Sequence, residues 1–548
     1  MDRRNREIKM NRHDGYYRRM ALPAILITTV VFIMPVGAVF LRAFLSGNGL
    51  WETFSDSYTW RLLLFTVWES FLSAFLSVLL AIPFSIFFSR YTFFGRRAIL
   101  TMSDAAFALP AILAVLGFVI YYGNNGIVNS ALKAISGGKW AAKVLYSFKA
   151  IILAHVYLNF PVAFSLITSS LCSMPDTEEK ASRLLGASEI KTFIRITLPK
   201  VRGMIIATFT LIFLFCFPSF LIVMSLGGNP RYFTMEAEIY KRTYTDVNPA
   251  GSASLALFSF LIMALLLVIT GYGREEKRVS RNRHTLIKAT KGKLTTALVL
   301  CVLIFLFMAP PMLSILYRAF FTKDGVFTLK AWTDIAARSR SGTGTSLNAI
   351  INSLLIASAS AFIAVNLASA IAIGSVRTGS RFTPLLTSLP MAMGSVSMGL
   401  GFSFIAARMP LRNMVTSYLL VLAAHIVVVM PFAVRTVLPG ARRIPLRLSL
   451  AAKTLGGDSR EAYRLVEKPL LKPFRRRAFA FAFALSLGEV NATLALSEGR
   501  VTTIPILIYK MINQYNYQGA SALAVILLSV AITMFAIGET GGDEYAVS

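Results

Sequence analysis

The stretch "ASRLLGASEIKTFIRITLP" (181–199) returns in altered form as "AAKTLGGDSREAYRLVEKP" (451–469). Each copy begins with alanine, has glycine five residues later, and ends with proline thirteen residues after that glycine. Both copies carry several charges although each lies between long apolar segments. A short polar element that recurs with the same internal spacing, 270 positions later, indicates that the chain contains an internal duplication.

The composition is that of a membrane protein with many spans. Of the 548 residues, 55% are hydrophobic and only 15% are charged, whereas a soluble domain of this size carries about 25% charged residues. The net charge of +30 does not indicate nucleic-acid binding, because the Lys and Arg residues lie mostly in short loops beside apolar runs. Basic loops of this kind remain on the cytoplasmic side of a membrane.

Runs of about 20 apolar residues are long enough to cross a bilayer and predict an all-α polytopic membrane protein with about 12 transmembrane helices. The predicted spans are 20–43, 62–89, 100–122, 149–171, 204–226, 252–273, 295–318, 349–375, 384–407, 415–438, 477–497 and 520–538. The basic amino terminus places residue 1 in the cytoplasm. The first span lacks a cleavage signal, so we interpret it as a retained helix.

The spans form two sets of six. Near the start of each set, "MPVGAVFLRAF" (34–44) resembles "APPMLSILYRAF" (309–320), and further on His155 and Pro161 match His425 and Pro431. Because each set has an even number of spans, the two are parallel repeats with a substrate path between them. The predicted organisation is a cytoplasmic segment (1–19), a first transmembrane domain (20–273), a basic cytoplasmic linker (274–294), a second transmembrane domain (295–538) and a tail (539–548).

The repeated polar element is predicted to form two short helices joined by a sharp turn on the cytoplasmic side. Proline at 175 or 445 ends the preceding helix, and Gly186 or Gly456 permits the turn. A solvated connecting loop would satisfy the same local pattern. Recurrence at a fixed spacing favours a docking element for a cytosolic partner instead.

This pattern resembles the signature of binding-protein-dependent ABC importer permeases, which reads Glu-Ala-Ala, three residues, Gly, nine residues and Ile-x-Leu-Pro. The resemblance covers both halves and implies the type I importer transmembrane fold, in the cytoplasmic (inner) membrane of a bacterium. It also implies two ATP-binding subunits on the cytoplasmic face and an extracytoplasmic solute-binding protein. The implied docking residues are Glu179, Ala181, Gly186, Leu198, Pro199, Ala451, Ala452, Gly456 and Pro469.

The sequence departs from the signature at its glutamate. That position holds Lys180 in the first copy and Leu450 in the second. Glu178 and Glu179 are candidates to replace it in the first copy, and the second copy has no evident replacement. The resemblance therefore carries over the docking role but not the contact that the glutamate makes.

The fused arrangement resembles permeases for thiamine and for ferric iron, particularly over 226–258 and 485–510. The resemblance leads us to expect thiamine as the substrate, with ferric iron as the alternative. Two other classes of protein stay open: an ion-coupled secondary transporter and a membrane scaffold without transport. The chain has no phosphate-binding P-loop of its own, so we expect it to be a transport subunit rather than an enzyme. It is expected to bind no cofactor, with ATP and Mg²⁺ held by the partner ATPase.

Glu489 and Asn491 fall inside the predicted eleventh span. A carboxylate at that depth is costly, and either lines a path for a cationic substrate or serves a helix–helix hydrogen bond. For His155 and His425 we favour structural hydrogen bonding over proton transfer. Cys172, Cys216 and Cys301 have no paired spacing, so neither a disulfide nor a metal site is predicted.

Overall fold

The computed structural model describes residues 15–45, 49–106, 109–175, 177–270, 286–336, 346–380, 383–409, 413–496 and 500–539. Most of the predicted amino-terminal segment, most of the basic linker and nearly all of the tail lie outside these residues. The long helices are α2 (Gly15–Leu45), α4 (Ser57–Arg90), α8 (Phe148–Cys172), α11 (Leu198–Cys216), α13 (Pro249–Ile269), α14 (Lys291–Phe320), α16 (Ser346–Thr378), α19 (Met414–Arg443) and α26 (Tyr517–Glu539).

Shorter helices complete the described chain, and they divide several of the predicted spans, among them 100–122, 384–407 and 477–497. The third span was predicted too early in the chain, since the helical stretch long enough to cross a membrane is Ala111–Ser136. In the first half the shorter helices are α3 (Gly49–Ser55), α5 (Arg96–Ala106), α6 (Ala111–Tyr122), α7 (Ile127–Ser136), α9 (Thr177–Leu184), α10 (Glu189–Thr192), η1 (Phe193–Thr197), η2 (Val223–Gly227), η3 (Pro230–Tyr232) and α12 (Met235–Tyr244). In the second half they are α15 (Lys330–Ala336), α17 (Thr383–Ser388), η4 (Leu389–Ala392), α18 (Ser395–Ala406), α20 (Leu446–Thr454), α21 (Ser459–Glu461), η5 (Ala462–Glu467), α22 (Lys468–Leu470), α23 (Lys472–Leu487), α24 (Asn491–Leu496) and α25 (Ile504–Asn513).

The predicted all-α membrane fold is confirmed, but the count of 12 continuous spans is not. The described residues contain 10 helices long and apolar enough to cross a membrane, or up to 11 if the pair Leu386–Ala392 and Ser395–Ala406, bent by 96°, counts as one span. The predicted eleventh span (477–497) was wrong as a single helix, because α23 stops at Leu487 and a new helix begins at Asn491. Gly488 lies at that break, and glycine lowers the stability of a helix interior.

The first half has a comparable interruption after its fifth span. Helix α11 ends at Cys216, and Pro218 follows two residues later. Proline lacks the N–H that the next helical turn requires, so it ends the helix here. A π-helical segment, η2, resumes at Val223. Both fifth spans are thus broken at matching places in the repeat.

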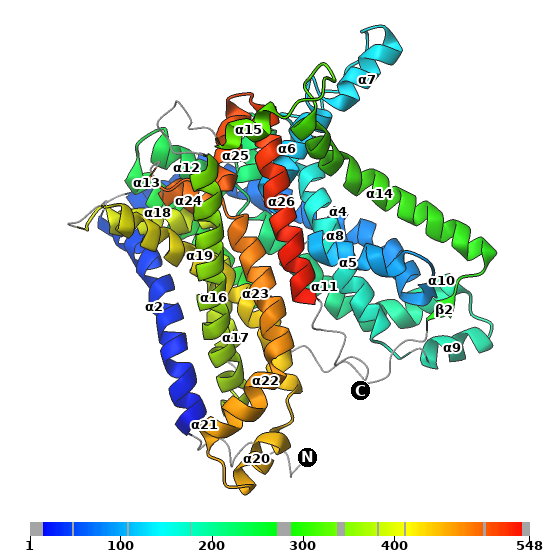
Figure 1. The fold of residues 1–548 in the computed structure, drawn as a ribbon, viewed down its shortest axis with the longest axis vertical. Coiled ribbons are helices and arrows are strands. Elements are labelled where there is room, and N and C mark those ends of the chain that lie inside the picture. The colour runs from blue at the N-terminus through cyan, green and yellow to red at the C-terminus, as the bar shows by residue number, and fades with distance from the viewer. Residues whose placement is uncertain are drawn as a thin grey trace. The chain divides into compact units, whose positions relative to one another are not determined.

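The chain forms two compact units that do not follow the sequence repeats. Unit 1 contains Met1–Asp56, Glu238–Arg274 and Phe327–Ser548, and unit 2 contains Ser57–Ala237 and Glu275–Val326. In unit 1 the first helix of the chain, α2, packs beside α16 and α18 of the second repeat (Figure 1). In unit 2 the opening helix of the second repeat, α14, packs on α6 of the first.

Each of these exchanged contacts centres on a glycine facing a proline. In unit 2, a Cβ placed on Gly117 would lie 2.7 Å from the carbonyl oxygen of Pro311. In unit 1, a Cβ on Gly401 would lie 2.8 Å from the Cβ of Pro35. Only glycine allows two membrane helices to approach this closely.

An aromatic-rich core holds unit 2 together. Phe88, Phe160 and Phe164 are buried between α4 and α8, and Ile304 of α14 packs on the same cluster. A two-residue parallel pairing between β1 (Tyr91–Thr92) and β2 (Ile287–Lys288) ties the end of α4 to the segment that enters α14. The start of α14 is thereby held against the first half.

Candidate functional site: two repeated polar loops

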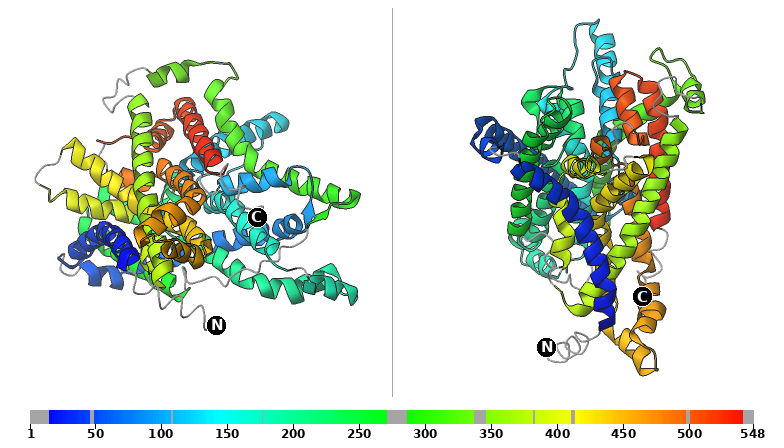
Figure 2. Two further views of the ribbon diagram at one scale, coloured as in Figure 1. Left: turned by 60° about the horizontal axis from the view of Figure 1, so that its bottom comes forward. Right: turned by 90° about the vertical axis from the view of Figure 1, so that its left-hand side faces the viewer.

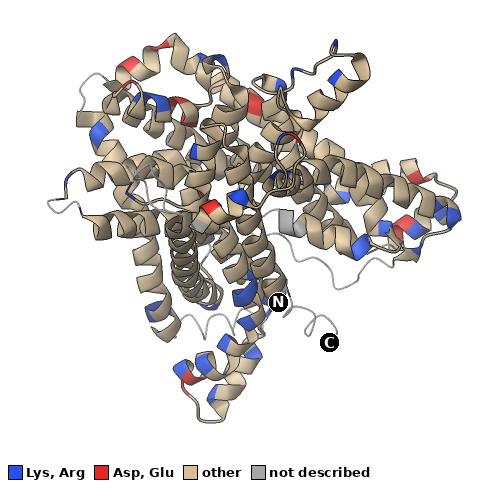
Figure 3. Ribbon diagram, turned by 45° about the horizontal axis from the view of Figure 1, so that its top comes forward, with Lys and Arg blue, Asp and Glu red and all other residues tan. Residues whose placement is uncertain are grey.

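The repeated polar element forms two similar loops at the ends of the long helices. Loop 1 is residues 177–197, in unit 2, and loop 2 is residues 446–467, in unit 1. The right-hand view of Figure 2 shows the segment of loop 2 extending past the ends of α16 and α19. In Figure 3 the long helices are almost free of charge, and Lys and Arg gather at these loops.

The turn of each loop is fixed by its glycine. Gly186 has φ +82° and Gly456 has φ +92°, a left-handed conformation that side chains with a Cβ disfavour. Around Gly186 the backbone bonds are Gly186 N–H to Arg183 and Ala187 N–H to Ser182, both near 3 Å. The same two bonds recur at the second glycine. They form a Schellman motif, so the predicted sharp turn is confirmed in both copies.

The helix after each turn begins with a side-chain cap formed by residues next to it in the sequence. Ser188 accepts a hydrogen bond from the Lys191 amide and caps α10. In loop 2, Asp458 and Glu461 form a reciprocal capping box. Such caps stabilise a helix start by about 1 kcal/mol. A π-helical segment follows in each loop and continues into the fifth span of its half.

Apolar side chains are exposed at the tips of the loops. Leu184 and Leu185 of loop 1 are 89% and 88% exposed, and Leu455 of loop 2 is 88% exposed. Ile190 and Leu465 are also exposed. Exposed leucines within a charged loop, outside the apolar spans, are typical of a surface that contacts another protein.

A buried ion pair lies beneath loop 1. Arg90, the last residue of α4, donates from Nη2 to Glu179 Oε2 at 3.1 Å. Thr197 Oγ1 donates to the other carboxylate oxygen at 2.5 Å. Glu179 is only 9% exposed, so its carboxylate points into the protein rather than out toward a partner. Neighbouring Glu178 is exposed and pairs with Lys200 at 2.6 Å.

Loop 2 has a buried ion pair at the same place. Arg377, near the end of α16, donates from Nε to Glu467 Oε1 at 2.7 Å. Ser449 Oγ donates to the same oxygen at 2.6 Å. Glu467 is fully buried. Sequence reasoning missed Arg90, Arg377 and Glu467, although the matching "AFLSV" and "AFIAV" segments place the two arginines at equivalent repeat positions.

The other predicted docking residues lie on or near the outer face of the loops. The residues at the repeated alanine, glycine and proline positions are exposed in both copies: Ala181, Gly186, Pro199, Ala451, Gly456 and Pro469. Ala452 and Leu198 are half-buried. Their docking role stays a prediction.

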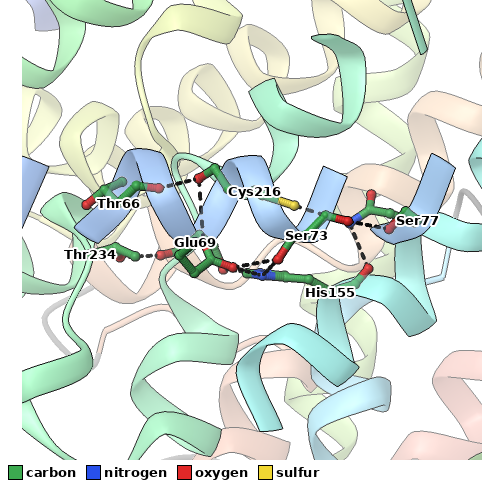
Figure 4. A network of polar contacts seen from close by, with 10 residues as sticks. Thr66, Glu69, Ser73, Ser77, His155, Cys216 and Thr234 are labelled. Atoms are coloured by element: carbon green, nitrogen blue, oxygen red, sulfur yellow. Dashed lines mark hydrogen bonds and ion pairs between the residues drawn. The ribbon is translucent and has the colours of Figure 1, made fainter. Parts of the chain in front are cut away.

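A second polar network lies within the helices of unit 2. Glu69 of α4 and His155 of α8 form a buried pair, and His155 Nε2 lies 2.8 Å from Ser219 Oγ at the break after α11. Ser73 Oγ donates to Glu69 at 2.8 Å. Figure 4 shows Glu69, Ser73 and His155 pointing toward one another. The sequence interpretation did not single out Glu69, although an acidic residue in an apolar span is a signal of its own.

In the matching network of unit 1, no carboxylate is among the hydrogen-bond partners within the described part of the chain. His425 lies 2.7 Å from Ser486 Oγ and 2.7 Å from Thr493 Oγ1. Ser360 donates to Ser486 at 2.8 Å. Both histidines therefore join the fourth span of their half to its broken fifth span. This geometry agrees with the structural hydrogen bonding favoured from the sequence.

Glu489 and Asn491 lie at the break between α23 and α24 rather than inside a continuous helix. A Glu489 carboxylate oxygen accepts a hydrogen bond from the Ala492 amide at 3.0 Å and so caps α24. The side-chain oxygen of Asn491 is buried, with no hydrogen-bond partner in the described part of the chain. Two polar oxygens thus lie at an interruption of the fifth span, where backbone groups are also freed from the helix.

Cys172, Cys216 and Cys301 are free thiols. Among the described residues, no group of three His, Cys, Asp or Glu side chains is arranged to hold a metal ion.

Known proteins resemble this chain over nearly its whole length. Residues 81–281 match the family of binding-protein-dependent transport system inner membrane components. The thiamine transport system permease protein ThiP of Brucella abortus (strain 2308) is 30% identical over 515 residues, covering 91% of this chain and 92% of that protein. ThiP of Escherichia coli (strain K12) is 29% identical, covering 95% of this chain and 97% of that protein.

A ferric-iron permease is also similar. The ferric transport system permease protein FbpB of Actinobacillus pleuropneumoniae is 25% identical, with coverage of 97% of this chain and 80% of that protein. The repeated loops, the helical membrane fold and this full-length similarity all indicate the same family. The chain belongs to the binding-protein-dependent transport system inner membrane components, as a fused two-domain ABC importer permease of the bacterial inner membrane.

Proposed function

We propose that this permease carries thiamine into the cytoplasm. The observation that supports the proposal most strongly is the 30% identity to a thiamine permease over 91% of the chain. Ferric iron is the second candidate, supported by the weaker similarity to a ferric permease, at 25% identity.

The two loops are the proposed docking sites for two ATP-binding subunits. Each loop presents an exposed leucine beside its turn, Leu185 in loop 1 and Leu455 in loop 2. Apolar anchors surrounded by polar side chains are typical of protein interfaces. This assignment places both loops and the amino terminus in the cytoplasm, and it places the surface for a solute-binding protein on the opposite side. ATP and Mg²⁺ would be bound by the partner subunits, whose closure would move the loops.

We propose that the break in the fifth span of the second repeat, between α23 and α24, forms part of the translocation path. Thiamine is an organic cation, and Glu489 supplies a carboxylate at this break. Asn491 adds a buried amide oxygen with no hydrogen-bond partner in the described residues. Irregular backbone within a membrane occurs where it is buried in protein or lines a path.

Uptake measurements separate the two substrates. The chain is co-expressed with the ATPase and binding protein of its own transport system in cells that lack thiamine uptake, and labelled thiamine and labelled ferric iron are offered separately. We expect ATP-dependent accumulation of thiamine and no accumulation of iron above cells that lack the chain. Accumulation of iron without thiamine would replace the proposed substrate with the second candidate.

The loop turns give a direct test of the docking role. Gly186→Val and Gly456→Val should each leave the chain in the membrane but lower uptake, because a Cβ at positive φ costs roughly 1 kcal/mol or more. No atom lies within 4 Å of the position where either Cβ would be placed, so strain in the turn, not a clash, tilts the loop. Alanine should therefore have a smaller effect than valine at the same position.

Lys191→Ala is the matched control, since Lys191 is exposed in the same loop. Membrane abundance, ATP hydrolysis and uptake are measured together for all variants. Normal uptake by both valine variants at normal abundance would show that the loops only connect spans.

A further inference from the structure

Each loop is joined to the second span of its half by a buried cluster of three side chains, named here the loop triad. Triad 1 is Arg90, Glu179 and Thr197, and triad 2 is Arg377, Ser449 and Glu467. In each triad the arginine comes from the end of a long helix, α4 or α16. The other two side chains come from opposite sides of the glycine turn.

The two triads have the same composition by charge but opposite arrangements. Repeat position 179 or 449 holds the carboxylate in triad 1 and a hydroxyl in triad 2. Repeat position 197 or 467 holds a hydroxyl in triad 1 and the carboxylate in triad 2. The carboxylate and the hydroxyl have therefore changed places while the arginine has stayed.

Contacts within the triads explain why either arrangement works. Glu179 accepts from Arg90 at 3.1 Å and from Thr197 at 2.5 Å, so one carboxylate joins the span to both sides of the loop. In triad 2 the arginine reaches both loop partners: Arg377 donates to Glu467, at 2.7 Å from Nε, and to Ser449, at 3.3 Å from Nη2. The hydroxyl completes the connection by donating to the carboxylate, as Ser449 does to Glu467 at 2.6 Å.

Burial separates these carboxylates from a direct role in docking. Glu467 is fully buried and Glu179 is nearly so, so neither presents its carboxylate to a partner surface. The exposed ion pairs around loop 1, Lys200 with Glu178 and Arg183 with Glu189, are of the kind that contributes little to rigidity because water competes for the charges. Buried charge pairs with complementary hydrogen bonds fix geometry far more strictly.

We propose that the two loop triads are positioning devices that fix each loop to the second span of its half, so that displacement of the loop by an ATPase turns α4 or α16. The proposal rests on the proposed function as an ATP-driven importer. It assigns Arg90, Glu179 and Thr197 and their counterparts to the transmission of movement, not to contact with the ATPase. The two triads are equivalent in this proposal, because each consists of an arginine–carboxylate pair and a hydroxyl that donates to the carboxylate.

Exchange variants test this equivalence. Glu179→Ser removes the carboxylate from triad 1, and Glu179→Ser combined with Thr197→Glu gives it the arrangement of triad 2. In the assembled importer in proteoliposomes, the single variant should transport about 10-fold less substrate per ATP hydrolysed, because removing one member of a buried ion pair is strongly destabilising and would loosen the loop from α4. The exchange variant should recover to within about 2-fold of the native ratio, since coupled sites do not add. Triad 2 should respond in the same way: Glu467→Thr alone should lower the ratio, and Glu467→Thr combined with Ser449→Glu should restore it.

Glu189→Ser is the matched control, because it removes an exposed carboxylate of the same loop that takes no part in the triad. It should leave the ratio of transport to ATP hydrolysis unchanged. A single variant with native coupling, or an exchange variant that fails to recover while Glu189→Ser is normal, would overturn the proposal. Loss of both single and exchange variants from the membrane would also overturn it, because equivalent triads must fold alike.

Hydrogen exchange on the purified chain alone separates this proposal from the importer function. Amides of residues 177–197 should exchange faster in Glu179→Ser and return to the native rate in the exchange variant. Unchanged rates in the single variant would show that the triad does not hold the loop. Failure of the native complex to transport would count against the proposed function, and the amide rates would still decide whether the triads fix the loops.

Discussion

Gly401→Leu should remove most of the folded permease from the membrane, and Gly117→Leu should do the same. A side chain at either position would enter the backbone of the opposing helix, since even a Cβ on Gly117 would lie 2.7 Å from the Pro311 carbonyl oxygen. Overpacking of a close contact costs up to about 3 kcal/mol, and backbone cannot move aside as a flexible side chain can. Membrane abundance and the thermal stability of the detergent-extracted chain are the measurements.

Gly37→Leu and Gly203→Leu are the controls for these variants. Gly37 lies on α2, the same helix that supplies Pro35, and no atom lies within 4 Å of its Cβ position. Gly203 on α11 is equally open. Gly37→Leu and Gly203→Leu should therefore leave membrane abundance and thermal stability near the native values. Equal abundance of all four leucine variants would contradict the exchanged packing of the first spans.

Arg377→Met should be the most damaging single change beneath the loops. It leaves the carboxylate of Glu467 fully buried without its positive partner, and removing one member of a buried ion pair costs about 3–5 kcal/mol. Arg377→Met combined with Glu467→Leu should recover much of the stability, because two apolar side chains of similar size often replace a buried pair without loss. Thermal denaturation of the purified chain measures both.

Arg464→Met is the comparison, since Arg464 is exposed in the same loop, and it should change stability by no more than about 0.5 kcal/mol. If the double variant is no more stable than Arg377→Met, the ion pair does not account for the loss. We expect the double variant to fold but to transport less substrate per ATP, because the link between loop and span is absent.

Local features of the chain could be predicted from the sequence because each depends on neighbouring residues. Apolar runs of sufficient length identified most of the spans, since a bilayer imposes that length wherever the run occurs. The two-helix form of the loops was predictable because Gly186 and Gly456 occupy a left-handed turn that excludes most other residues. The duplication was visible because both copies keep the same spacing.

Interruptions within the spans were only partly predictable. The predicted eleventh span continued through Gly488 and Glu489, because one glycine and one carboxylate change the average hydropathy of a long apolar run very little. At this place Glu489 caps the next helix by accepting from the Ala492 amide, which gives the break a hydrogen-bonded structure of its own. A local polar group that satisfies freed backbone is a detail that average hydropathy does not contain.

By itself, the sequence determined the membrane class, the two repeats, the two polar loops and the family resemblance, all of which depend on composition, spacing or short-range conformation. Only the tertiary structure decided which spans pack together and where the charges of the loops point. The first span of each repeat packs on the other repeat through a glycine–proline contact between residues far apart in the chain. The carboxylate of Glu179 turns inward because Arg90, 89 residues away, provides its partner. Close approach and charge pairing are properties of folded neighbours, and no local pattern in the chain specifies which neighbours those are.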